Sequence, residues 1–209
     1  MLPVATAHTS DQQFILARSG LAEFNINPAA GPLDPIVIRH EIGHALGTGT
    51  LWEENEVYND GSELNDEQFL GDRTLEGGTP GEYEGPNALV GFQAEYDAAA
   101  TFIPVELDGG GGTAHGHWNE VTDNLRSENS PGFDSDPGDG GPAPTDPMGR
   151  SLDDELMTGF RSGDNYISVT TILSLPDIGF TTIDPFAIPE PSSAALILGG
   201  LFLLGRRKR

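Results

Sequence analysis

Apolar residues occur in short groups along this chain, separated by polar stretches that are rich in glycine and proline. Residues 14–17 are enough for one short strand or one helical turn, and residues 102–107 predict a second short strand. Residues 85–100 predict a helix whose buried side would include Leu89, Phe92, Ala94 and Tyr96. Residues 167–177 predict another helix, for which Ser168 is a suitable N-cap.

The clearest predicted helix runs from Pro35 to Gly47. Asp34 is a good N-cap, and proline is favoured at the first helical position. Gly47 can end the helix in a left-handed conformation. We expect the buried side of this helix to be supplied by five apolar residues, namely Ile36, Val37, Ile42, Ala45 and Leu46.

Two polar segments predict loops. Residues 53–72 are acidic and contain Asn, Asp and Gly, which favours a loop over a core segment. Residues 127–147 are dominated by Ser, Pro, Gly and Asp and predict an exposed acidic insertion. Its carboxylates Asp134, Asp136 and Asp139 would suit Ca²⁺, but their spacing departs from the usual calcium loop, so a solvated acidic loop remains the alternative.

Composition limits the class of protein. A length of 209 residues suits one domain with appendages, and the pattern of short strands, helices and long loops predicts an α+β fold. The absence of cysteine excludes disulfides and thiolate metal ligands. A formal net charge of −23 would repel nucleic acid, which excludes nucleic-acid binding, and suits a secreted protein in salty or Ca²⁺-containing medium.

The predicted helix at 35–47 contains His-Glu-x-x-His. His40 and His44 are four residues apart, so they share one face of the helix and can bind one Zn²⁺ from the same side. Glu41 lies beside them, where a carboxylate can act as general base toward zinc-bound water. The alternative is a surface helix with two solvated histidines.

A catalytic zinc usually has three protein ligands, so one is missing from this pair. A histidine three residues after Gly47 would complete the set of three ligands within one short segment, but Thr50 stands there. His8 is isolated. His115 and His117 both follow a glycine-rich run that can bring a distant segment back to the helix. Composition does not choose between them.

Several segments together resemble the leishmanolysin-like metzincin peptidases. The most specific are Gly116-His117-Trp118-Asn119-Glu120 and Glu155-Leu156-Met157-Thr158-Gly159, and residues 47–52, 85–89, 104–106 and 177–180 add to them. The resemblance covers about residues 33–186. It implies a metzincin-like zincin catalytic domain with an active-site helix, long loops and a mainly helical C-terminal subdomain.

The resemblance also implies roles for single residues. His40, His44 and His117 would bind one catalytic Zn²⁺, Glu41 would be the general base, and Met157 would be the Met-turn residue beneath the metal. Two further residues, His115 and Glu120, are candidates for the shell around the ligands. The implied function is a zinc-dependent endopeptidase that hydrolyses bonds in a peptide or protein substrate.

The last residues resemble a PEP-CTERM sorting signal. Pro189-Glu190-Pro191 is followed by an apolar stretch at 194–204 and a basic end at 206–209. This resemblance divides the chain into a peptidase domain at 1–186 and a sorting tail at 187–209. It implies export, a precursor held transiently in the membrane, cleavage by an exosortase-type enzyme, and a mature protein in the cell envelope or extracellular matrix.

Two further expectations follow from the sequence. Metzincins build one wall of their cleft from a sheet lying mostly before the zinc helix, and 39 residues before His40 are too few for it, so we expect the sequence to start inside a longer protein. The rival functions are a catalytically inactive zinc-binding matrix or surface protein and an acidic Ca²⁺-binding adhesin. Replacement of Glu41 tests the first rival, and Ca²⁺-dependent stability tests the second.

Overall fold

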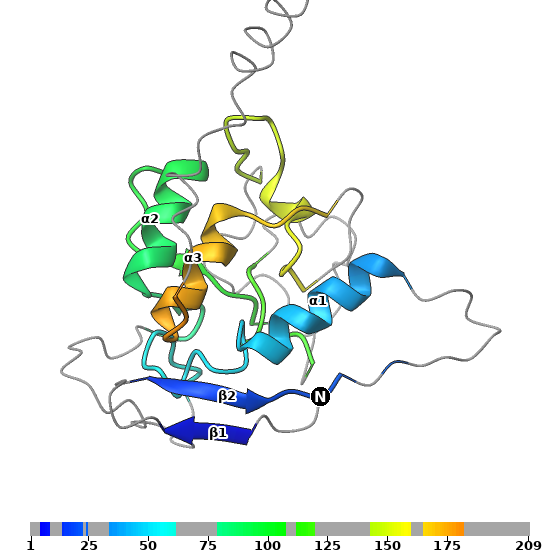
Figure 1. The fold of residues 1–209 in the computed structure, drawn as a ribbon. Coiled ribbons are helices and arrows are strands. Elements are labelled where there is room, and N and C mark those ends of the chain that lie inside the picture. The colour runs from blue at the N-terminus through cyan, green and yellow to red at the C-terminus, as the bar shows by residue number, and fades with distance from the viewer. Residues whose placement is uncertain are drawn as a thin grey trace, which may run out of the picture.

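The structure is a computed structural model, and it describes residues 5–8, 14–22, 24, 34–61, 79–107, 112–119, 143–159 and 165–181. These residues form a mixed helix and strand arrangement (Figure 1), so the broad α+β prediction is confirmed. The elements in chain order are β1 (Ala5–His8), β2 (Ile15–Ser19), α1 (Pro35–Leu46), β3 (Glu82–Tyr83), α2 (Pro86–Glu95), β4 (Ile103–Pro104), the 3₁₀ helix η2 (Leu152–Asp154) and α3 (Val169–Asp177).

The described strands pair in two small antiparallel sheets. β1 pairs with β2, with His8 opposite Ile15, and β3 pairs with β4, with Tyr83 opposite Ile103. β2 runs past the C-terminal end of α1 (Figure 1), where a Cβ added to Gly20 would lie 2.8 Å from the Cβ of Ala45. Of residues 14–17, Ile15 to Ala17 belong to strand β2, so this segment is a strand and not a helical turn.

Helix α1 begins and ends as the sequence predicts. The Asp34 carboxylate accepts a hydrogen bond from the backbone N–H of Ile36 at 2.9 Å, and Pro35 is the first helical residue. Gly47 ends the helix with a φ of 119°, in the left-handed region. Its N–H donates to carbonyl oxygens of the last turn, which satisfies the end of the helix.

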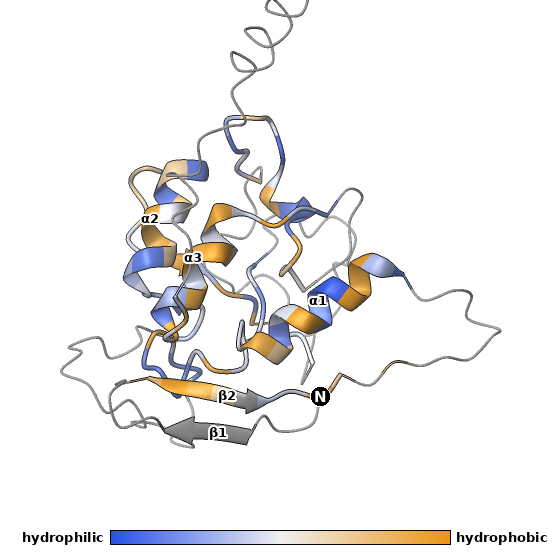
Figure 2. Ribbon diagram, in the orientation of Figure 1, coloured by the Kyte–Doolittle hydropathy of each residue, from blue (hydrophilic) through white to orange (hydrophobic). Residues whose placement is uncertain are grey.

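The prediction for the buried side of α1 is largely wrong. Val37, Ile42 and Leu46 are 38, 49 and 41 % exposed, and Figure 2 shows how much of α1 is hydrophobic. The buried side is the one that carries His44, which is 4 % exposed. The helix therefore turns the face that carries His40 and His44 inward, because that face meets the segment of Met157, and leaves much of its apolar side at the surface.

Helix α2 ends five residues earlier than predicted. It stops at Glu95, and Asp97 accepts from the N–H of Ala99 at 2.9 Å, a local turn that competes with further helix. Phe92 is buried as predicted, whereas Ala94 is exposed. Helix α3 has the predicted N-cap, since the Ser168 hydroxyl accepts from the N–H of Thr171 at 3.0 Å.

Helices α2 and α3 cap each other. Glu95, the last residue of α2, accepts hydrogen bonds at 2.8 and 2.9 Å from the first two backbone N–H groups of α3. Asp177, the last residue of α3, accepts from the N–H groups of Asn87 and Ala88 in the first turn of α2, at 3.0 and 2.9 Å. Two antiparallel helices are thereby joined at both ends by carboxylates that also complement the helix dipoles.

An aromatic cluster forms the centre of the core. The rings of Trp52 and Trp118 are stacked with centroids 4.5 Å apart, and Tyr83 packs edge-on against both. Val57 and Tyr58, which lie in the segment predicted to be a loop outside the core, are 0 and 2 % exposed. The segment has no helix or strand in its described part, but backbone hydrogen bonds hold it over the cluster, so its expected exclusion from the core is wrong.

The end of the predicted exposed insertion is also packed. Asp146 is 5 % exposed and forms an ion pair with Arg150, whose Nη2 lies 2.6 Å from Oδ2. Burial alone would raise the pKa of Asp146, but the hydrogen bonds and charge of Arg150 outweigh it and lower the pKa. The three candidate calcium ligands, Glu120 and the predicted sorting tail lie outside the described residues. Within the described ranges, no helix is both long enough and apolar enough to cross a membrane.

Candidate metal centre

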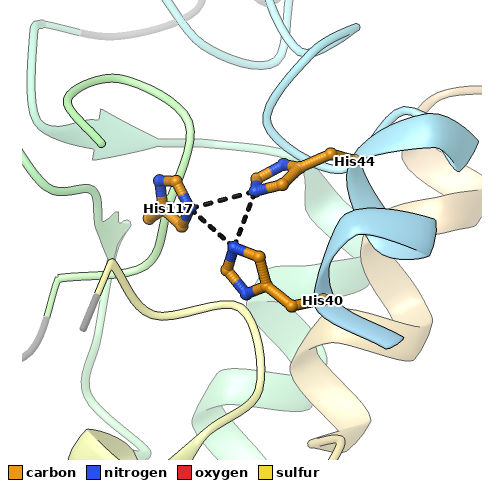
Figure 3. A group of neighbouring side chains, drawn as sticks. All are labelled: His40, His44 and His117. Carbon is orange, nitrogen blue, oxygen red and sulfur yellow. Dashed lines mark hydrogen bonds between the residues drawn. The ribbon is translucent and has the colours of Figure 1, made fainter. Parts of the chain in front are cut away.

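Three histidines from two distant segments meet at one point. His40 and His44 lie one turn apart on α1, and His117 comes from the segment 112–119. Their Nε2 atoms point toward one another (Figure 3), at 3.0 Å for His40 to His44, 3.0 Å for His40 to His117 and 2.9 Å for His44 to His117. The structure thus brings the predicted trio together, and it selects His117 over His115.

Backbone carbonyl groups hold the outer nitrogen of each ring. A carbonyl oxygen only accepts hydrogen bonds, so each Nδ1 carries the proton and each neutral ring directs the lone pair of Nε2 inward. The three Nδ1 contacts are His40 to Leu156 O at 2.7 Å, His44 to Thr48 O at 2.9 Å and His117 to Thr113 O at 2.7 Å.

The surroundings keep the rings of His44 and His117 neutral. Burial, followed by the charge of the neighbouring His40, lowers the pKa of His44 to about 4. Burial, followed by the charge of His44, lowers the pKa of His117 to about 3. Near neutral pH the Nε2 atoms of His44 and His117 therefore face each other without a proton between them, which is the electrostatic arrangement that a bound cation relieves.

The trio fits a metal ion. Zinc–imidazole bonds are about 2.0–2.1 Å long, so two ligand nitrogens of one ion lie no more than about 4 Å apart, and the three separations here are well within that limit. His44 and His117 are each 4 % exposed, whereas His40 is half-buried. The site therefore has a closed side and a side that is open toward His40.

Met157 packs directly beneath α1. It is 1 % exposed, and a Cβ added to Gly43 would lie 2.5 Å from its sulfur. Leu156, the preceding residue, supplies the carbonyl group that binds His40. The predicted Met-turn segment thus contacts α1 at two successive positions, and glycine is needed at position 43 for this close approach.

Glu155 was not singled out from the sequence, although it organises this segment. Its carboxylate is fully buried and accepts from the N–H of Met157 at 2.5 Å, from the N–H and hydroxyl of Ser168 at 3.0 and 2.9 Å, and from the hydroxyl of Thr171 at 2.7 Å. Burial raises its pKa, against the effect of these hydrogen bonds. Glu155 lies at the end of a run of acidic residues, and such runs usually face solvent. In the sequence, only its position directly before Leu156 and Met157 indicates a special role.

The segment that carries His117 is held from both sides. The N–H of Glu106 donates to His117 O at 3.0 Å, and the N–H of Trp118 donates to Met157 O at 3.0 Å. The indole N–H of Trp118 also donates to the hydroxyl of Thr171 at 2.8 Å. The segment of His117 is thereby tied to the Met157 segment and to α3, which are far from it in sequence.

The other predicted site residues have separate positions. Glu41 lies on α1 between the two histidines, is half-buried, and forms no hydrogen bond or ion pair with the part of the chain that the structure describes. Its carboxylate is therefore available for proton transfer. His115 is not one of the trio; its Nδ1 lies 2.7 Å from the hydroxyl oxygen of Tyr58.

A recess opens beside His40. It has a volume of about 150 Å³ and lies between the first turns of α1 and the Met157 segment. The side-chain oxygen of Asn165, one of its lining residues, is buried and has no hydrogen-bond partner among the described residues. The remaining lining residues are Ile36, Val37, Leu156, Thr158 and Gly159.

Comparisons of this chain with models of protein families, with curated proteins and with solved structures find no match.

Proposed function

We propose that this protein is a zinc-dependent endopeptidase of the leishmanolysin-like metzincin type. The observation that carries the proposal is the set of three histidines whose Nε2 atoms converge within 3.0 Å of one another while each Nδ1 is bound to a carbonyl group. The order of the parts along the chain, with α1 followed by the His117 segment and the Met157 segment, supports the metzincin arrangement.

Zinc is the metal that suits this set of ligands best. Three neutral imidazoles with one side open match a catalytic zinc site, whereas a structural site is closed by four protein ligands. Among the described residues the cluster contains these three ligands and no fourth. Zinc held by His40, His44 and His117 would polarise the scissile carbonyl group and lower the pKa of a bound water.

Glu41 is the residue that moves the proton in this proposal. Its carboxylate takes a proton from the attacking water as the new carbon–oxygen bond forms. It then gives that proton to the leaving amine nitrogen as the peptide carbon–nitrogen bond breaks. Its carboxylate, adjacent to His40 on α1, is suited to both transfers.

The recess beside His40 offers room for one substrate side chain. Its walls include Ile36, Val37 and Leu156, so it favours an aliphatic side chain next to the scissile bond. Burial of that side chain would also orient the peptide relative to Glu41, and such positioning is a large part of catalysis.

For the tail we propose export and sorting. Residues 187–209 would hold the precursor in the membrane until an exosortase-type enzyme releases it, and the mature peptidase would act in the cell envelope or extracellular matrix. The support is the sequence pattern of Pro189-Glu190-Pro191, the apolar stretch and the basic end.

The test is cleavage of an unfolded protein substrate with Zn²⁺ present, with zinc binding measured on the same samples. Glu41→Gln is expected to bind zinc as the parent does and to lose activity by about 10²–10⁴-fold. His117→Ala is expected to lose both. Glu84→Gln, the same chemical change at a half-buried residue outside the metal centre, is the matched control and keeps both.

Three results would contradict the proposal. Activity that survives Glu41→Gln would exclude this residue as the base. Tight zinc binding by the full chain without cleavage of any unfolded substrate would favour the catalytically inactive matrix protein. Retention of zinc by His117→Ala would exclude His117 as a ligand.

A further inference from the structure

His115 adopts a backbone conformation that is uncommon for residues other than glycine. Its φ is 65°, in the left-handed region that glycine occupies at little cost. Gly112 and Gly116, in the same described segment, do not have left-handed φ values. The chain therefore places histidine where glycine would be less strained, which indicates that the side chain has a task there.

The imidazole of His115 has a fixed partner. The hydroxyl oxygen of Tyr58 lies 2.7 Å from Nδ1 of His115, and it accepts a hydrogen bond from the backbone N–H of Gly81 at 3.2 Å. The two side chains are thus joined by one hydrogen bond, whose donor depends on the tautomer of His115. Tyr58 is 2 % exposed and packs against Trp52, so it is a rigid anchor.

The backbone of His115 belongs to the turn that presents His117. The N–H of His115 donates to Glu106 O at 2.7 Å, and the N–H of Glu106 donates to His117 O at 3.0 Å. Within the same turn, the ring of His117 is bound to Thr113 O at 2.7 Å. His115 thus lies in the chain between Thr113 and His117, whose hydrogen bond orients the ring of His117.

The turn after α1 lies against the same segment. Gly49 has a φ of 74°, and a Cβ added there would lie only 2.0 Å from the carbonyl oxygen of Gly116. The close approach leaves the loop little room to shift toward α1. The conformation of residue 115 consequently affects where His117 stands relative to His40 and His44.

We propose that His115 is a positioning residue of the metal centre. Its hydrogen bond with Tyr58 holds the left-handed turn that directs Nε2 of His117 toward α1. This inference rests on the proposed metal centre and adds that metal affinity depends on a side chain that does not itself bind the metal.

The test compares the parent chain with His115→Gly, Tyr58→Phe and the double variant. The dissociation constant for Zn²⁺ is measured by competition with a chromophoric chelator, and the melting temperature is measured without metal. Loss of a group that orients a metal ligand typically weakens binding by 10–100-fold, and we expect about tenfold for each single variant. The double variant is expected to bind no more weakly than His115→Gly, because both changes remove the same hydrogen bond.

The metal-free melting temperature separates positioning from general stability. Glycine accepts the left-handed conformation without strain, so His115→Gly is expected to melt no lower than the parent while binding zinc more weakly. Asn87→Ala, which removes a hydrogen bond to Asp177 far from the loop, should lower the melting temperature and leave zinc affinity unchanged. Gly116→Ala adds a Cβ with only ordinary contacts in the same loop and should bind zinc as the parent does.

The outcomes distinguish this inference from the proposed function. Unchanged zinc affinity in both single variants, with His117→Ala still losing the metal, would overturn the role of His115 and leave the metal centre intact. An affinity loss in His115→Gly that is fully additive with that of Tyr58→Phe would also overturn it. A parent chain that binds no zinc would overturn the metal centre and the inference together.

Discussion

The sulfur of Met157 occupies the space beside the α-carbon of Gly43, where any other residue would place its Cβ. The added Cβ would lie 2.5 Å from the sulfur and 2.9 Å from the terminal methyl carbon. Gly43 lies within the His-Glu-x-x-His segment of α1, so this contact sets the distance between α1 and the Met157 segment beneath it. The motif His-Glu-x-x-His allows any residue at position 43, and the packing against Met157 explains why glycine is there.

Replacement of Gly43 by alanine is expected to destabilise the protein. Alanine favours a helix by about 1 kcal/mol over glycine, but overpacking against a buried side chain costs about 1–3 kcal/mol. We expect the free energy of unfolding in urea to fall by about 1 kcal/mol. In a Met157→Ala background the crowding is removed, so the same change should become stabilising; a gain in stability in the parent background would contradict the packing argument.

Replacement of Glu155 by glutamine is expected to cost more. The glutamine amide would direct its NH₂ group at one of the backbone N–H groups that now donate to the carboxylate. That N–H group would then lack an acceptor, and a buried donor without an acceptor costs about 1–3 kcal/mol. We expect a loss of about 2 kcal/mol in urea unfolding. Glu41→Gln, the same change at a half-buried carboxylate without a partner among the described residues, should alter stability by less than about 0.5 kcal/mol. Equal effects in the two variants would refute the role of Glu155.

The stability of the metal-free protein is expected to fall as the pH is lowered from about 6.5. The folded-state pKa values of His44 and His117 are lowered from 6.5 to about 4 and about 3. Below pH 6.5 the unfolded chain therefore binds protons that the folded chain does not bind, and this stabilisation is lost as the pH falls toward 4 and then 3. It is fully present above 6.5.

Urea unfolding in the presence of a chelator, at several pH values, checks this window. His44→Asn removes one of the two titrating groups, so its stability should decline less steeply between pH 6.5 and 4 than that of the parent. The comparison of slopes cancels the titration of other residues. A parent slope equal to that of His44→Asn would show that His44 is not held neutral by the fold.

The sequence predicts the parts of the site that local rules govern. Asp34, Pro35 and Gly47 define α1 because caps act within one turn, and the spacing of His40 and His44 follows from the helical period. Ser168 begins α3 for the same reason. In each case the residues that interact are neighbours in the chain.

The remaining features depend on contacts between distant segments. Composition does not separate His117 from His115, and only the family resemblance points to His117. In the structure, the pairing of the His117 segment with residues 104–106 and 157–158 brings its ring to α1. Glu155 is buried because α3 supplies its hydrogen-bond donors. The prediction placed the apolar residues of α1 on its buried face because it used hydrophobicity alone. In this helix the histidines take the buried face, so much of the apolar side lies at the surface.

The recess beside His40 leads to a last prediction, on specificity. Val37 lines the recess and is 38 % exposed, so its replacement changes the shape of the wall with little effect on the core. Val37→Ala enlarges the recess and should favour peptides with a larger apolar side chain next to the scissile bond. Val37→Phe should favour alanine or glycine there. Since one methylene group in a pocket changes kcat/KM by about 10–200-fold, we expect the ratio of kcat/KM for leucine and alanine peptides to shift by about tenfold in opposite directions.

Val90→Ala and Val90→Phe, at an exposed valine of α2, are the matched controls and should leave that ratio unchanged. Equal ratios in the parent and both Val37 variants would show that the substrate side chain binds elsewhere.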